Sequence, residues 1–177
     1  MSYIVDGYTS NPEAVVHKRI LEVFYQNAFT EISQESSKLR TYNTFKKEVR
    51  REPYLTCVKN VKDRISMTKL RLSNHELMIE KGRHSNLHKS ERKCPFCPLV
   101  EDETHFLMVC HIYATLRNDL IEAVEEKLKD ELMVKSDIKL MTKYLLGNNE
   151  IAPLVAKYIT KALELRNFLI DNPKRLI

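Results

Sequence analysis

Residues 94–110 read CPFCPLVEDETHFLMVC, and this stretch constrains the fold of the chain more than any other. Its cysteines and histidine follow the spacing Cys-x2-Cys-x7-His-x4-Cys, with a proline after each of the first two cysteines. Two cysteines separated by two residues form a tight knuckle that offers both thiolates to one tetrahedral ion, and a histidine and a third cysteine complete the set that zinc prefers. The spacing predicts a Zn²⁺ site made by Cys94, Cys97, His105 and Cys110.

The coordination number predicts the type of zinc site. Four protein ligands fill a tetrahedral sphere and leave no position for water, so we expect a structural site and not a hydrolytic one. The alternative is a core that happens to contain these thiols and an imidazole. His111 is a second candidate ligand, although its use in place of Cys110 would leave the Cys110 thiolate without a metal ion. Cys57 lies far from the cluster and is expected to be a small buried side chain.

The metal site also constrains the helix that carries His105. Residues five apart on a regular α-helix are separated by about 140° around its axis, because each residue turns the chain by about 100°. His105 and Cys110 can both reach one ion only if the helix ends near Val109 and Cys110 lies on the exiting turn. We expect a new helix from about Ile112, and the acidic residues 101–103 at the positive N-terminus of the short helix.

Helical periodicity covers most of the remaining chain. The 177 residues include only 3 glycines and 6 prolines, too few for the frequent turns of an all-β protein. Apolar side chains recur every three or four residues, which indicates amphipathic helices around a core. The predicted core stripes are Val15, Val16, Ile20, Val23, Phe24 and Ile32; Leu39, Tyr42, Phe45 and Val49; Leu55, Val58, Val61, Ile65 and Leu72; Leu116, Leu120, Val124 and Leu128; and Leu154, Tyr158, Ala162, Leu165 and Leu169. We predict a mostly α fold with an N-terminal helical extension, residues 1–37, and a small helical domain, residues 38–177, stapled by one zinc knuckle.

Positive charge is concentrated in one third of the chain. Residues 38–93 hold 16 basic and 6 acidic side chains, a balance of +10, whereas residues 94–135 hold 4 and 9, a balance of −5. A concentrated basic block is typical of proteins that bind phosphate groups, and an ordinary solvated surface is the alternative.

The cellular location is predicted from patterns that the sequence lacks. The first 12 residues show no basic start followed by an apolar run, and no apolar stretch approaches the roughly 18 residues of a membrane helix. We expect an intracellular protein, in the nucleus or cytoplasm, without a membrane or small-molecule partner. Thiols stay reduced there, which favours metal binding over disulfides.

The region around the cysteines resembles a known module. CPFC…VEDETHFLMVC followed by HIYATLRNDL is similar to the zinc-binding module found C-terminal to the reverse transcriptase of non-LTR retrotransposons. A Cys-Cys-His-Cys site of this spacing is typically followed there by a tyrosine and a Leu-Arg pair, here Tyr113 and Leu116-Arg117. The blocks KLRTYNTFKKEVRREPYL, RISMTKLRLSNHELMIEKGRH and ALELRNFLI also look like segments of these proteins, so the resemblance covers roughly residues 38–170.

The resemblance implies a module that holds RNA or target DNA during reverse transcription. The chain lacks the paired-aspartate motif of a polymerase, so it would be non-catalytic by itself. Within the basic block, arginine and lysine side chains can neutralise phosphates, while asparagine and histidine can donate to a phosphate or a base edge. The candidate contacts are Lys69, Arg71, Asn74, His75, Arg83, His88, Arg92 and Lys93.

A zinc-stiffened protein-interaction module is the alternative function. It would dock on a reverse transcriptase or another protein, with the acidic helix at residues 119–131 as the contact surface. Tyr42 and Phe45 are either core residues or stacking platforms for bases.

We predict that the chain has no polymerase or nuclease turnover of its own. Both reactions need carboxylates that converge on hard divalent ions with open coordination positions. The acidic residues here lie at helical spacing or just before His105. A magnesium-dependent nuclease assay should show no cleavage above background. Cleavage that survives repurification and disappears in a single variant, Asp119→Asn or Glu103→Gln, would contradict this prediction.

Overall fold

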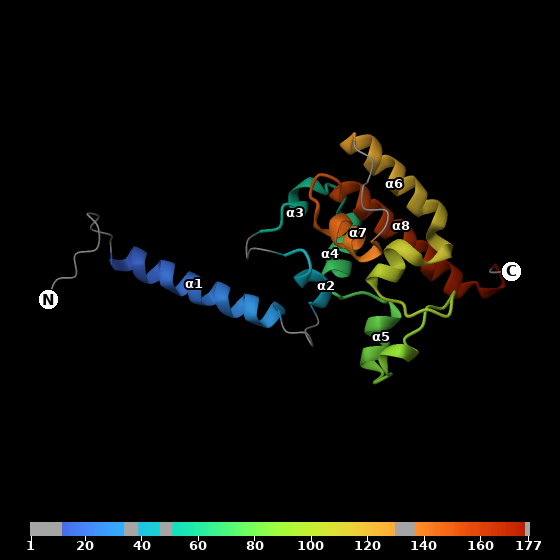
Figure 1. Cartoon of the computed structure of the whole chain (residues 1–177), viewed down its shortest axis with the longest axis horizontal. Coiled ribbons are helices and arrows are strands. Elements are labelled where there is room, and N and C mark those ends of the chain that lie inside the picture. The colour runs from blue at the N-terminus through green and yellow to red at the C-terminus, as the bar shows by residue number, and fades with distance from the viewer. Residues whose placement is uncertain (1–11, 34–38, 47–50, 130–136, 176–177) are drawn as a thin grey trace.

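A computed structural model of the chain describes residues 12–33, 39–46, 51–129 and 137–175 (Figure 1). Within these ranges every regular element is a helix, and one isolated bridge joins Lys93 to Val100. The elements are α1 (Pro12–Ser33), α2 (Arg40–Asn43), α3 (Tyr54–Cys57), α4 (Val61–Arg71), α5 (Met78–His84), η1 (Lys89–Glu91), η2 (His105–Val109), η3 (His111–Tyr113), α6 (Ala114–Leu128), α7 (Ile138–Gly147), α8 (Ala152–Asp171) and η4 (Pro173–Arg175). The predicted mostly α fold is confirmed.

Helix α8 is the centre of the core. It contacts α3, α4, α6 and α7, and its side chains Val155, Ala156 and Ile159 are fully buried. The helix begins at Ala152 and accommodates Pro153 in its first turn, where the missing N–H costs no hydrogen bond. Its predicted stripe is confirmed, with Tyr158 buried at 4% exposure.

None of the described helices is long and apolar enough to span a membrane.

The stripes predicted between residues 39 and 72 are divided differently in the structure. Helix α2 is only four residues long, and the chain leaves its helical path again between α3 and α4. The Asn60 side chain accepts a hydrogen bond from the Asp63 amide (3.1 Å) and so caps the start of α4. This new start rotates the helix, so that Met67 and Leu70 are buried while Val61 and Ile65 are exposed.

The predicted core stripe of α1 is also not buried. Val16, Ile20 and Phe24 are 58%, 61% and 61% exposed, and Figure 1 shows α1 running away from the other helices. The apolar periodicity correctly predicted that this segment is helical, but the burial of its apolar side was predicted wrongly. The predicted boundary between residues 37 and 38, and the side chain of Ile32, lie outside the described residues.

A buried arginine fastens the segment before α4 to that helix. Arg71, at the end of α4, is 2% exposed and lies between the rings of Phe45 and Tyr54, 4.4 and 4.3 Å from their centroids. Its Nη2 donates to Glu52 (2.7 Å), which also pairs with Lys46. Burial opposes the charged carboxylate of Glu52, but the hydrogen bond from Lys46 and the charge of Arg71 outweigh it and lower its pKa.

A second buried ion pair ties α8 to the cysteine region. The Glu101 carboxylate accepts two hydrogen bonds from Arg166 (2.7 and 2.8 Å) and one from the backbone N–H of Met78 (2.7 Å). Both charged residues are at most 2% exposed. The fork-to-fork geometry satisfies both partners, whereas removal of either one would leave an uncompensated charge in the interior.

We predict that Arg166→Met destabilises the protein by about 3–5 kcal/mol, because it leaves the buried Glu101 carboxylate without its cation. Urea denaturation followed by circular dichroism measures the change. Lys62→Met is the matched control, since it removes one partner of an exposed ion pair with Glu164 and should leave the midpoint nearly unchanged. Equal effects of the two variants would contradict the prediction.

Candidate metal centre

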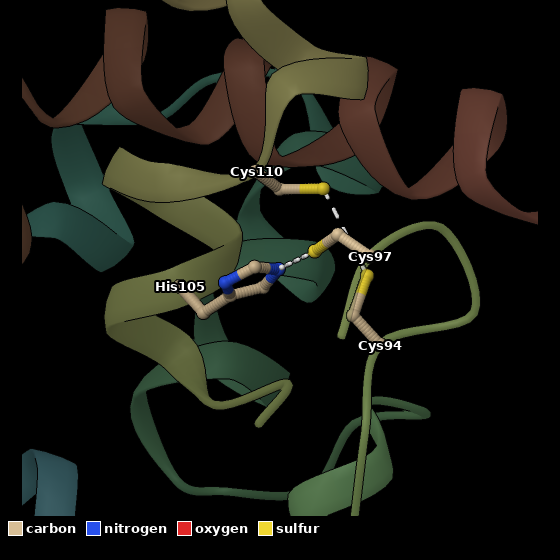
Figure 2. Close-up of side chains that lie close together, drawn as sticks. All are labelled: Cys94, Cys97, His105 and Cys110. Carbon is tan, nitrogen blue, oxygen red and sulfur yellow. Dashed lines mark hydrogen bonds between the residues drawn. The ribbon is translucent and has the colours of Figure 1, made fainter. Parts of the chain in front are cut away.

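The structure brings the four predicted ligands to one point (Figure 2). Their donor atoms all lie within 4.8 Å of one another. Cys94 and Cys97 come from the loop closed by the Lys93–Val100 bridge, while His105 begins η2 and Cys110 follows it. All except Cys97, which is half-buried, lie in the interior. The arrangement can hold a metal ion such as zinc.

The spacing of the donor atoms fits a tetrahedral ion. Two thiolates about 2.3 Å from a tetrahedral zinc lie about 3.8 Å apart. The Sγ atoms of Cys94 and Cys110 are 3.8 Å apart, and Cys97 Sγ lies 3.3 Å from His105 Nε2. A disulfide requires an S–S distance of about 2.0 Å, so the sulfurs of Cys94 and Cys110 are too far apart for one. The donor set and its geometry therefore both suit zinc.

The first two ligands are positioned by a tight backbone turn. The Cys94 amide donates to the Leu99 carbonyl (2.8 Å), and the Phe96 amide points at the Cys94 sulfur (3.5 Å). The prolines at positions 95 and 98 restrict the backbone on either side of Phe96. An amide directed at a thiolate stabilises its negative charge, so this turn is suited to hold a deprotonated cysteine.

The last two ligands are positioned by a π turn. Residues His105–Val109 wind as a π-helix, and the Cys110 amide donates to the His105 carbonyl five residues earlier (2.9 Å). This turn is wider than an α-helical turn, so residues five apart lie closer to one face than the 140° separation allows on a regular helix. The prediction that the helix ends at Val109 and that Cys110 lies on the exiting turn is confirmed. The π winding itself was not predicted.

The acidic run before His105 divides into three different roles. Asp102 accepts a hydrogen bond from the His105 amide (2.8 Å), as expected for a helix N-terminus. Glu101 instead pairs with Arg166. Glu103 is buried, accepts a hydrogen bond from Ser73 (3.1 Å) and forms another with His75 Nε2 (2.9 Å). Two of the three carboxylates therefore join this segment to other parts of the chain, Glu101 to α8 and Glu103 to Ser73 and His75. The helix expected from about Ile112 is α6, which begins at Ala114 because Ile112 lies in the 3₁₀ turn η3 before it.

The thiols influence one another's protonation. The hydrogen bond between Cys94 and Cys110, together with burial, raises the pKa of Cys94 to about 12. The same bond lowers the pKa of Cys110, and burial raises that of Cys97. Metal ligation requires the thiolate forms, so zinc binding would release protons and would weaken as the pH falls.

The eight predicted nucleic-acid contacts are not all at the surface. Lys69, Asn74, Arg83, His88 and Lys93 are exposed. Arg71 is buried between two rings, and the side chain of His75 is 1% exposed beside Glu103. Arg71 pairs with the half-buried Glu52 and His75 with the buried Glu103, so neither side chain belongs to the exposed contact surface.

Arg92 has a largely internal role as well. Its guanidinium donates to the carbonyls of Ile79 (3.0 Å) and Leu87 (3.1 and 2.9 Å), which fixes the turn after α5. Gly82 packs against it so closely that a Cβ there would lie 2.5 Å from Arg92 Cγ. From the sequence, Gly82 is expected to end a short helical segment, but it lies inside α5, where an isolated glycine is a signal for such close packing.

The two remaining cysteine and histidine candidates lie outside the cluster. His111 is exposed and is not among the four clustered side chains. Cys57 is half-buried, and its thiol donates to the carbonyls of Pro53 (3.3 Å) and Asn149 (3.5 Å). Cys57 therefore packs the end of α3 against the turn before α8.

Fold and site together define a mostly α-helical protein with a buried Cys-Cys-His-Cys cluster. Comparisons with models of known protein families, with curated proteins and with solved structures found no match to this chain.

We predict one zinc per chain in protein purified without chelator. Because binding at a structural site contributes directly to folding, a chelator or Cys97→Ser should remove the metal and loosen residues 94–113. Cys57→Ser is the matched control and should retain a full equivalent. Elemental analysis measures the metal, and amide hydrogen exchange measures the loosening. Folded wild-type protein with substantially less than one equivalent would contradict the prediction.

Proposed function

We propose that this chain is a zinc-stabilised nucleic-acid-binding module, non-catalytic by itself and derived from the C-terminal region of a retroelement reverse transcriptase. The observation that carries the proposal is the basic segment, defined here as residues 81–93, next to the metal centre. It holds five lysine and arginine side chains, one acidic side chain and two histidines. All five cations except Arg92 are exposed.

The metal centre and the basic segment form one structural unit. Lys93 pairs with Val100 across the knuckle, and the Glu101 amide donates to the Arg92 carbonyl (2.9 Å). The Ile79 amide then donates to the Glu101 carbonyl (3.0 Å) and extends this connection to α5. Zinc, when bound, would supply a cross-link that fixes the knuckle, and the knuckle in turn holds the basic segment.

The exposed cations suit a phosphate backbone. Fixed cations on one segment release counterions from nucleic acid when they bind, which favours association whatever the sequence. Asn74 lines a surface hollow with Lys81 and His84, so a group that can bond a base edge lies beside the cations. Lys69 is exposed in the last turn of α4 and would add to the same positive field.

The closed coordination sphere supports a binding role and not a catalytic one. All four metal positions would be taken by protein ligands, which leaves none for an activated water. An intracellular location, in the nucleus or cytoplasm, agrees with this function because nucleic acids and reduced thiols coexist there. The origin from a retroelement rests on the resemblance of residues 38–170 described above.

A protein-interaction module is the second candidate, and two surfaces favour it. One is the exposed apolar side of α1, with Val16, Ile20 and Phe24. The other is a groove between α6 and α8 whose lining includes Leu116 and Lys161. Apolar helix faces and grooves of this kind are common docking sites for partner helices.

We predict that Arg83→Ala, Lys89→Ala and Lys93→Ala together weaken nucleic-acid binding and flatten its salt dependence. Each lost phosphate contact should reduce the slope of log affinity against log salt by about one. Fluorescence anisotropy with single-stranded RNA, duplex DNA and heparin, at several salt concentrations, measures both effects.

The matched control replaces Lys139, Lys157 and Lys161, three exposed lysines on α7 and α8, by alanine. This triple variant loses the same charge from helices other than the basic segment and should keep its affinity. Identical losses in both triple variants would show that general charge and not the basic segment drives binding, and the interaction module would then be preferred.

A further inference from the structure

The π turn between His105 and Cys110 needs support from outside its own segment. π-helical hydrogen bonds are rare, and an isolated peptide of this sequence would favour the α-helical pattern. In that pattern the His105 and Cys110 side chains would point to different sides of the helix and could not share one ion. The observed winding must therefore be stabilised by contacts elsewhere in the fold.

The carbonyls of the π turn show where this support comes from. The chain leaves the helix at Cys110, whose ψ of 126° is extended, so the helical hydrogen-bond ladder stops there. The Cys110 carbonyl accepts one backbone hydrogen bond, from the Tyr113 amide (3.3 Å). Arg117 of α6 donates from Nε to the Leu107 carbonyl (2.8 Å) and from Nη2 to the Cys110 carbonyl (2.5 Å). One guanidinium thus fixes the end of the turn and the ligand after it.

A second side chain reaches the same turn from α8. The Tyr158 hydroxyl lies 3.2 Å from the Phe106 carbonyl and 3.3 Å from the Leu107 carbonyl. Tyr158 is 4% exposed and its ring packs near that of Phe106, with centroids 6.3 Å apart. The hydroxyl is buried, so its loss would take from the Phe106 carbonyl its side-chain donor, while the Leu107 carbonyl would keep only Arg117.

We infer that Arg117 and Tyr158 are positioning residues for the metal centre: they hold residues 105–110 in the π winding that points His105 and Cys110 at one ion. Neither side chain touches the ligand atoms. They act through the backbone and so orient half of the ligand set. Hydrogen-bond partners outside the ligand set typically change metal affinity by about 10-fold to 100-fold. The inference rests on the zinc site of the proposed function but not on nucleic-acid binding.

The geometry also predicts which replacements fail. The two bonds of Arg117 come from different nitrogens of a planar fork and diverge to carbonyls three residues apart. A lysine ammonium is a compact point charge and cannot reproduce this arrangement. Arg117→Lys should therefore resemble Arg117→Met, although the charge is retained. Tyr158→Phe keeps the ring packing and removes only the hydroxyl.

The test measures zinc affinity of the full chain by competition with a chromogenic chelator. We expect Arg117→Met, Arg117→Lys and Tyr158→Phe each to lower the affinity by about 10-fold or more. Co²⁺ bound in place of zinc provides a second readout, because its visible absorption reports tetrahedral thiolate coordination. Weakened or shifted Co²⁺ bands are expected in the same three variants.

Two controls separate positioning from general loss of stability. Arg64→Met removes a guanidinium–carbonyl hydrogen bond of the same kind (Nη1 to Val58, 2.9 Å) away from the centre. Tyr54→Phe removes a buried hydroxyl bonded to Thr68 (2.8 Å). Both should destabilise folding in urea yet leave zinc affinity and Co²⁺ bands unchanged.

The possible outcomes distinguish this inference from the proposed function. If wild-type protein binds zinc and the Arg117 and Tyr158 variants match their controls in affinity and spectra, the inference is wrong while the zinc site stands. If wild-type protein binds no zinc, the metal site itself fails, and the inference with it. Should Arg117→Met not fold, Tyr158→Phe tests the same positioning with a smaller change.

Discussion

The buried carboxylate of Glu101 is the interaction on which the arrangement of this domain depends. It lies one residue after the knuckle bridge, and its oxygens bond Arg166 of α8 and the first amide of α5. In an interior of low dielectric constant such charge-assisted bonds are strong, and an unpaired charge there is costly. These three bonds hold α8, α5 and the knuckle together at one carboxylate.

The metal cluster and the ion pair hold the same short loop from two sides. Cys94 and Glu101 flank the Lys93–Val100 bridge, one facing the cluster and the other facing α8. Residues 94–113 contain no long helix that could supply a large apolar face of its own. Specific polar bonds and a metal site replace the area of apolar contact that a longer element would bury.

Local patterns were predicted well where short-range chemistry decides the outcome. The spacing of Cys94, Cys97, His105 and Cys110 predicted their convergence, because ligand type and loop length restrict how such residues can meet. The helix end at Val109 followed from the same constraint. Predictions of burial from periodicity were less reliable. They held for α8, but the stripe of α1 is exposed, since a periodic pattern defines one side of a helix without defining what covers it.

The sequence by itself determined the donor set, the mostly α-helical composition and the concentration of positive charge in residues 38–93. Only the tertiary structure decided which basic residues are available at the surface. Arg71 and Arg92 look alike in sequence, yet one is enclosed by two rings and the other bonds backbone carbonyls. The tertiary structure also decided the π winding before Cys110. Its partners, Arg117 and Tyr158, come from two later helices, and contacts between such distant segments depend on the assembled fold and not on local spacing.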